Sequence, residues 1–316
     1  MEVQGLDAFL FSFNSVFPIF LVMALGYFLK HIGVINDAFI NVGTKITFTV
    51  AIPCMVFPSI LNAHLEDTFD LKLIIYAVLA TIVALLILRL VVPRFIHEAA
   101  SWSAFIQGAF RSNFIIIGFA LASSLGGEAA LAKTAMMLVF IGPLYNILSV
   151  LVLAEAEKGK EGHSIAKSLY TNPVLISTTL AIILSLLNVQ LPEFISSPID
   201  MLGDMTLPLS LLTLGGSISF NKEEVNLRQA LVASTIKVVI IPLIFIPLAY
   251  LLGFRGIDII ICLILFGSPA AVSCFPMAYQ MGADHRLSGM IIAMTNTMAI
   301  LTLFLFVFAL RILSII

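Results

Sequence analysis

The sequence has few charged residues. Only 11% are Asp, Glu, Lys or Arg, against about 25% in a typical soluble domain. Hydrophobic residues make up 60% of the chain, and the mean hydropathy is +1.12. This composition excludes a soluble globular domain, and without a basic stripe it excludes nucleic acid as a partner. The apolar runs are near twenty residues long, so they predict an all-α integral membrane protein in a lipid bilayer rather than a barrel of shorter strands.

Catalytic motifs are also missing. The three cysteines, Cys54, Cys262 and Cys274, lie inside apolar runs and form neither a disulfide framework nor a CxxC site. All five histidines lie in loops or near helix ends, and HExxH, GxSxG and Walker motifs are absent from the sequence. We therefore expect no enzyme, no bound cofactor and no metal site, although coupling to a proton or sodium gradient stays open.

Acidic residues are absent from the middle of the apolar runs. The nearest to an embedded acid is Asp204, four residues before Pro208. Two cations, Arg111 and Lys237, do lie within runs, and buried ionisable groups are functional candidates because their burial is costly. The excess of positive charge favours an anionic ligand and argues against a sodium/proton antiporter with a paired acidic site.

Ten apolar runs are long enough to cross a bilayer, which takes about 20 residues each. Lys and Arg between the runs gather on one side of the membrane, which is expected to be the cytoplasmic side. Both termini are then expected on the outer side of the inner (plasma) membrane. The basic-free start of the chain favours a first spanning helix over a cleaved signal. The predicted spans are 12–31, 40–62, 71–92, 102–124, 131–154, 169–188, 202–219, 229–252, 257–281 and 286–312.

The sequence also contains an internal repeat. An offset of 155 residues aligns Pro18 with Pro173 and Pro53 with Pro208, and an offset of 156 aligns Asn113 with Pro269. Five spans is an odd number, so the second copy is expected to be inverted, as in many secondary transporters. The predicted organisation is a first repeat at 1–155, a cytoplasmic linker at 156–168 and a second, inverted repeat at 169–316.

Pro269 lies in the centre of the ninth predicted span, beside Gly267 and Ser268. Proline inside a helix removes a backbone donor and clashes with the preceding turn. The repeat partner Asn113 is central in the fourth span, so both helices are predicted to break at mid-membrane and form a binding site. The alternative is that the proline only kinks a packed helix.

Six motifs follow one another along the chain: VFPIFLVMALGYFLKHIGVI, ITFTVAIPCMVFPSIL, FRSNFIIIGFAL, NPVLISTTLAIILSLLNVQLPEFI, LGDMTLPLSLLTLGGSIS and GSPAAVSCFPMAYQMGAD. In their order and spacing the chain resembles the auxin efflux carrier family, which includes plant auxin exporters and bacterial permeases for small carboxylates. The resemblance covers nearly the whole chain. It implies ten helices in two inverted repeats, with helices four and nine broken and crossing, and a substrate near the crossover at Asn113 and Pro269. One departure is Ala120, where the family commonly has proline, so the first break would depend on Asn113 and Gly118.

The candidate binding residues cluster around the two breaks. Arg111 either attracts a carboxylate or satisfies the carbonyls of the broken helix. Asn113 offers an amide to substrate, or a bond between helices. Ser268 and Ser273 are either cavity hydroxyls or backbone partners. The full set of substrate-binding candidates is Asn113, Arg111, Ser268, Pro269, Gly118 and Ser273, with Lys237, Pro53 and Pro208 as secondary candidates.

The sequence therefore predicts a secondary transporter, by resemblance an efflux permease, for small organic anions such as mono- or dicarboxylates. It would work by alternating access at the crossover. The alternatives are a sodium-coupled organic-anion importer of the bile-acid-symporter type and a non-transporting membrane sensor. The sequence leaves a homodimer open and names neither the substrate nor the coupling ion.

Overall fold

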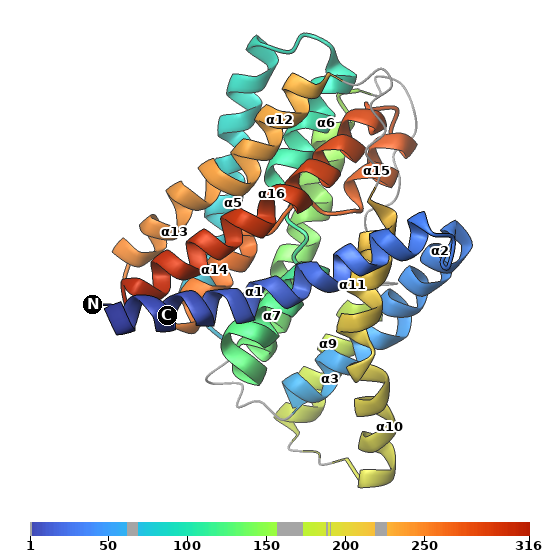
Figure 1. Cartoon of the computed structure of the whole chain (residues 1–316), viewed down its shortest axis with the longest axis vertical. Helices are drawn as coiled ribbons and strands as arrows, with labels where there is room; N and C mark the ends of the chain where they lie inside the picture. Colours follow the sequence, from blue (N-terminus) through green and yellow to red (C-terminus); the bar gives the residue numbers. More distant parts are fainter. Residues whose placement is uncertain (1, 62–68, 157–172, 188, 190, 219–225) are drawn as a thin grey trace.

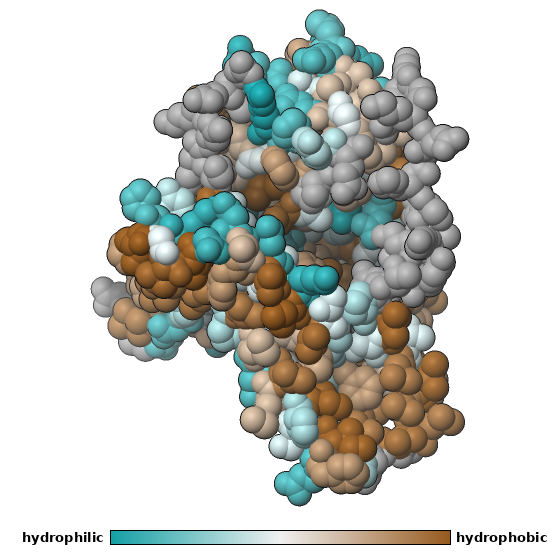
Figure 2. Space-filling model, turned by 90° about the vertical axis from the view of Figure 1, so that its right-hand side faces the viewer, coloured by the Kyte–Doolittle hydropathy of each residue, from teal (hydrophilic) through white to brown (hydrophobic). Residues whose placement is uncertain are grey.

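The described part of the chain is helical. A computed structural model describes residues 2–61, 69–156, 173–187, 189, 191–218 and 226–316, and these contain no strand. The predicted linker at 156–168 lies almost entirely outside the described residues. Large apolar side chains remain exposed along most of the long helices, and Figure 2 shows hydrophobic residues covering the lower part of one face. Such a surface suits contact with lipid tails rather than with water.

The helices form two groups, with α1 and α7 in contact with both (Figure 1). The first group packs α1 against α11 and α3 against α9 and α10. Its members are α1 (Glu2–His31), α2 (Asp37–Ile46), α3 (Ile52–Leu61), α9 (Pro173–Leu186), α10 (Glu193–Asp204) and α11 (Thr206–Ser217). The second group holds α5 (Leu71–Val91), α6 (Ala99–Phe110), α7 (Ile116–Leu153), α12 (Leu227–Thr235), α13 (Ile241–Leu251), α14 (Ile257–Gly267), α15 (Cys274–Gln280) and α16 (His285–Ile312).

Within the described residues, 6 helical segments are long and apolar enough to cross a membrane. They are 6–31, 37–58, 71–94, 116–153, 227–251 and 285–312. The other predicted spans overlap shorter helical segments: α6 and the start of α7 in 102–124, α9 in 169–188, α11 in 202–219, and α14 and α15 in 257–281. Most of α10 lies before the predicted span 202–219. The separation predicted between 124 and 131 is present at Gly127, where non-helical backbone angles divide α7 by a kink. Gly127 has φ +61°, a conformation that glycine adopts without steric cost.

Two π-helical turns widen the long helices just before prolines. One covers Thr47–Ala51 and precedes Pro53, and the other covers Ile236–Ile240 and precedes Pro242. Proline cannot donate to the preceding turn, so the helix accommodates it by a local change of hydrogen bonding. Such turns often occur at functional sites, and the second contains Lys237.

A cluster of three charges ties the second group together away from the breaks. Lys133 on α7 donates to Asp70 Oδ2 at 3.3 Å and also to Asp258. Asp70 caps the start of α5, and Asp258 lies in the first turn of α14. All three side chains are largely buried, so their attraction is only weakly screened by solvent.

Lys133→Met should therefore destabilise the fold, because it leaves two carboxylates facing each other without a cation. Removing one partner of a buried pair costs about 3 kcal/mol. We expect a clear fall in the melting temperature of the purified protein, and partial recovery when Asp258→Asn is added. Lys45→Met on the exposed side of α2 is the control. Equal melting temperatures for Lys133→Met and the wild type would show that the cluster contributes no stability.

Candidate functional site

Two interrupted helices cross near the centre of the second group. The chain leaves α6 at Phe110 and enters α7 at Ile116, and it leaves α14 at Gly267 and enters α15 at Cys274. The two short linking segments pair in antiparallel fashion through Ser112 and Ala270. The Asn113 N–H donates to the Pro269 carbonyl at 2.7 Å, and the Ala271 N–H donates to the Arg111 carbonyl at 3.1 Å. Each break thereby supplies hydrogen-bond partners to backbone groups of the other. Irregular backbone that is buried away from water needs such partners.

Asn113 starts the second half of the first broken helix. Its Oδ1 accepts from the Ile116 N–H at 3.3 Å, and its backbone carbonyl accepts from the Gly118 N–H at 3.1 Å. Asparagine is among the preferred residues for capping a helix N-terminus in this way. The first break therefore forms without the proline that the second has at Pro269, and Ala120 continues the helix.

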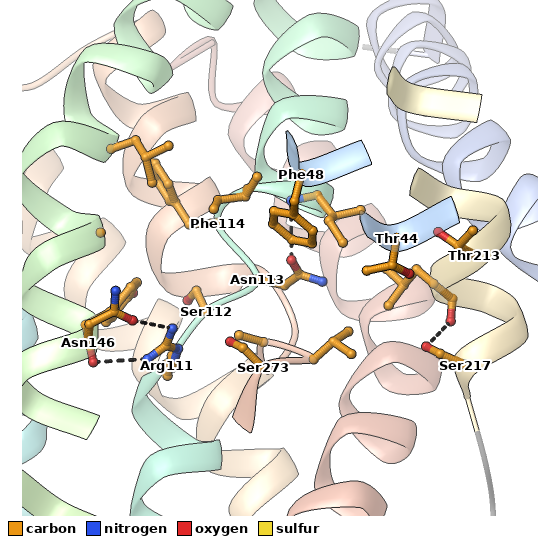
Figure 3. Close-up of a pocket in the computed structure, with 18 residues that line it drawn as sticks. Thr44, Phe48, Arg111, Ser112, Asn113, Phe114, Asn146, Thr213, Ser217 and Ser273 are labelled. Carbon is orange, nitrogen blue, oxygen red and sulfur yellow. Dashed lines mark hydrogen bonds between the residues drawn. The ribbon is translucent and has the colours of Figure 1, made fainter. Parts of the chain in front are cut away.

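A pocket of about 380 Å3 lies beside this crossover, between the two groups of helices. The two linking segments form one wall, α7 forms a second, and α2 with α11 form the third (Figure 3). The lining residues that the structure describes include no Asp or Glu. They are Thr44, Phe48, Arg111, Ser112, Asn113, Phe114, Ile115, Ile116, Leu138, Gly142, Tyr145, Asn146, Thr213, Leu214, Ser217, Ala271, Val272 and Ser273.

Among the described residues, Arg111 is the only cation that lines the pocket. Its guanidinium donates to Asn146 Oδ1 at 2.8 Å, to Ser149 Oγ at 2.9 Å and to the Tyr145 carbonyl at 3.2 Å, all on α7 (Figure 3). None of these partners is charged, and among the described residues Arg111 has no carboxylate within ion-pair distance. The contacts hold the guanidinium in place and leave its charge available to an anion.

Asn113 contributes a free donor to the same wall. Its side chain is buried, and its Nδ2 has no hydrogen-bond partner. In Figure 3 the amide points into the pocket, toward Thr44 on the opposite wall. A buried amide without a partner carries a desolvation cost of about 1–3 kcal/mol. A ligand with an acceptor oxygen would remove that cost.

The third wall comes from residues whose role the sequence did not reveal. Thr44, Thr213 and Ser217 place hydroxyl groups on it, beside the ring of Phe48. Thr213 donates to the Leu209 carbonyl at 2.9 Å and Ser217 to the Leu214 carbonyl at 2.7 Å, so both oxygens can still accept. Small polar residues on membrane helices usually serve helix packing, which is how the sequence alone interprets them.

The predicted site residues divide between the pocket and its support. Arg111, Asn113 and Ser273 line the pocket, whereas the other candidates do not. Pro269 supplies a carbonyl to Asn113, and Ser268 is buried with no partner for its hydroxyl. Gly118 lies against α14, where an added Cβ would come within 2.9 Å of Ile264.

The secondary candidates lie farther from the pocket. Pro53 accepts a bond from Ser177 on α9 at 2.8 Å, and Pro208 is within the first turn of α11. Lys237 is fully buried and contacts the crossover without lining the pocket. Direct substrate contact by these three residues has no support in this geometry. The described residues also contain no group of His, Cys, Asp and Glu side chains that could hold a metal ion.

The sequence is similar to known transporters over most of its length. An uncharacterized transporter of Methanothermobacter thermautotrophicus is 25% identical over 308 residues, which cover 93% of this chain and 97% of that protein. The uncharacterized transporter MJ1031 of Methanocaldococcus jannaschii is 22% identical, covering 92% and 96%. The uncharacterized transporter YfdV of Escherichia coli K12 is also 22% identical, covering 74% and 76%.

A helical chain with an apolar surface, two crossing helix breaks and transporter relatives points to a permease. The model of the membrane transport protein family matches residues 11–307, nearly the entire chain. The chain therefore belongs to the membrane transport protein family, the auxin efflux carrier type that its motifs resemble.

Proposed function

We propose that this protein is a secondary transporter for small organic anions such as mono- or dicarboxylates. The observation that carries the proposal is the pocket at the crossover, which presents the Arg111 guanidinium and the free Asn113 amide and has no acidic side chain among its described lining residues. Both groups donate hydrogen bonds to carboxylate oxygens. The N-terminus of α7 adds its partial positive charge from the same side.

The dimensions and chemistry of the pocket support a small substrate with an apolar part. A volume of about 380 Å3 is at the lower end of ligand pockets, which run from about 300 to 1,000 Å3. Phe48, Phe114 and Val272 line it together with the polar groups. A carboxylate bound at Arg111 would leave the remainder of the substrate against these side chains and the hydroxyls of α2 and α11.

The proposed membrane arrangement is ten spans in two inverted repeats, 1–155 and 169–316, with both termini outside the plasma or inner membrane. The paired breaks at 111–115 and 268–273 support it, since each lies in the fourth span of its repeat. Asp7 near the start of α1 and Arg311 near the end of α16 line the same cavity, so the two ends of the chain lie close together. An even number of spans would place both ends on the same side of the membrane.

Transport in this proposal is alternating access. The pocket lies between two groups of helices, so a movement of one group against the other would open it to either side in turn. The export direction rests on the family resemblance, and coupling to a proton or sodium gradient is a part of the proposal that flux measurements must decide.

The test is flux in proteoliposomes with radiolabelled malonate, malate, lactate and indole-3-acetate, with and without sodium or proton gradients. Saturable flux of at least one acid is the expected result. Uptake that requires sodium would favour the organic-anion importer. Specific binding of an acid without flux would favour the sensor, and neither binding nor flux would contradict the proposal for these acids.

Asn113→Asp should strongly reduce flux and leave the fold intact. Aspartate keeps an oxygen for the Ile116 N–H and is an equally good helix cap, but it replaces the free donor with a negative charge. A charge-assisted hydrogen bond is worth about 1.5–3 kcal/mol, so we expect about a 10-fold to 150-fold loss in flux. The matched control is Asn36→Asp, which makes the same change at the cap of α2, outside the pocket. Undiminished flux in Asn113→Asp, with the melting temperature of the wild type, would place the anion elsewhere.

A further inference from the structure

Lys237 lies deeper in the protein than the pocket does. Its side chain is fully buried (0% exposed) in the π-helical turn between α12 and α13. It does not line the pocket, and among the described residues it has no carboxylate within ion-pair distance. A lysine buried in this way is costly unless oxygen atoms surround its amino group. Its position therefore calls for a reason other than direct contact with substrate.

The atoms that receive Lys237 belong to the crossover. Its Nζ donates to Ser112 Oγ at 2.6 Å and to the Phe266 carbonyl at 2.9 Å. Ser112 Oγ in turn donates to the Leu265 carbonyl. These bonds connect the turn between α12 and α13 to both broken helices.

The two carbonyls lie in the last turn of α14, which ends at Gly267. The last carbonyls of a helix lack partners within it and carry the negative end of its dipole. A cation is stabilised there, and the hydroxyl of Ser112 completes a set of oxygen ligands. Ser268, in the segment that follows, is buried and has a further hydroxyl with no partner.

Hydroxyl and carbonyl oxygens at a broken helix are the ligands that bind sodium in other secondary transporters. We propose that Lys237 is a resident cation, whose amino group holds the crossover at a site that would otherwise take a monovalent metal cation. In this role Lys237 is a positioning residue, since it acts on the substrate through Ser112 and its neighbour Asn113. The effect of Lys237 on flux rests on the proposed transport function, which this inference extends. It makes flux by the wild type independent of sodium.

The test uses the purified full-length protein and the melting temperature in sodium chloride against choline chloride at equal concentration. Lys237→Ala removes the amino group and opens space for a cation beside Ser112 and Phe266. We expect a lower melting temperature in choline, and a rise of about 2–4 °C in sodium, the shift produced by a ligand at about ten times its dissociation constant in a protein of this size. Lys237→Met fills the space with an apolar chain and should show no sodium effect.

The control is Lys45→Ala, an exposed lysine on α2, which should behave in both salts as the wild type does. The proposal is overturned if Lys237→Ala melts at the same temperature in both salts, or if sodium specifically stabilises the wild type. If Lys237→Ala does not fold, Lys237→Ser opens the same space and is judged by the same two outcomes. This readout needs no substrate, so a failure to find flux would count against the proposed function and leave the cation site to be decided separately.

Discussion

Arg111→Met should reduce carboxylate flux by about 100-fold or more while the protein remains folded. The guanidinium is the only cation in the described lining of the pocket, and its contacts with Asn146, Ser149 and Tyr145 are to neutral groups. Hydrogen bonds to charged groups contribute about 1.5–3 kcal/mol each, and a bidentate carboxylate contact would involve two. Methionine keeps most of the length of the side chain and removes the charge and all five donors.

Arg111→Lys separates the charge of Arg111 from its geometry. Lysine keeps a point charge but cannot hold three partners on α7 and a carboxylate in the same plane. We expect a loss of about tenfold in kcat/KM, with an increase in KM, since the charge that attracts the anion is still present. The measurement is the concentration dependence of flux for the best acid found with the wild type.

Arg228→Met provides the matched control, because it removes the same charge from an exposed position on α12. Flux in this variant should match the wild type. If Arg111→Met transports as well as the control does, Arg111 serves only to connect the break to α7, which is the structural alternative for a buried arginine.

The broken helices were the most predictable part of the molecule. Pro269 with Gly267 and Ser268 indicates a break from local chemistry alone, and the repeat extends that expectation to Asn113. The structure has both breaks. Asn113 replaces the proline of the other break because its side chain caps the next helix, an effect that is local and therefore readable in the sequence.

The wall of the pocket opposite the crossover was not predictable in the same way. Thr44 and Thr213 lie far from Asn113 along the chain and reach the same pocket only through the packing of α2 against α11 and of α11 against α7. Lys237 shows the same limit, since the sequence places it in a span but gives no means of finding Ser112 and Phe266 as its partners. By contrast, the separation that the sequence predicts between 124 and 131 is present at Gly127, whose backbone conformation glycine adopts without steric cost.

Gly215→Ala should prevent the first group of helices from assembling. A Cβ added at Gly215 would lie 1.8 Å from the Met23 carbonyl oxygen, and one at Gly26 would lie 2.0 Å from that of Leu212. Both obstacles are backbone atoms, so no side chain can move aside. The helices α1 and α11 cross here with their backbones in contact, an approach that only small residues permit in membrane proteins.

The loss of stability expected for Gly215→Ala depends on which atoms must move to make room for the added Cβ. Elsewhere in a helix interior, Gly→Ala is favourable by up to about 1 kcal/mol, so a loss of stability here would have to come from the crossing itself. Overpacking usually costs about 1–3 kcal/mol where side chains can adjust, and more is expected where two helices must separate. We therefore expect Gly215→Ala and Gly26→Ala each to lower the yield of folded protein severely. Gly289→Ala is the control, since the nearest atom to its added Cβ is a ring carbon of Phe275 at 3.3 Å.

The consequence reaches the pocket because α11 carries three of its lining residues, Thr213, Leu214 and Ser217. Their distance from the crossover depends on how closely α11 approaches α1, and the two glycines set that approach. If Gly215→Ala folds normally but transports poorly, the crossing serves to position the pocket wall rather than to stabilise the fold. Normal folding together with normal flux would mean that α1 and α11 can separate without any effect on the site. The close crossing would then determine neither the stability of the fold nor the position of the pocket wall.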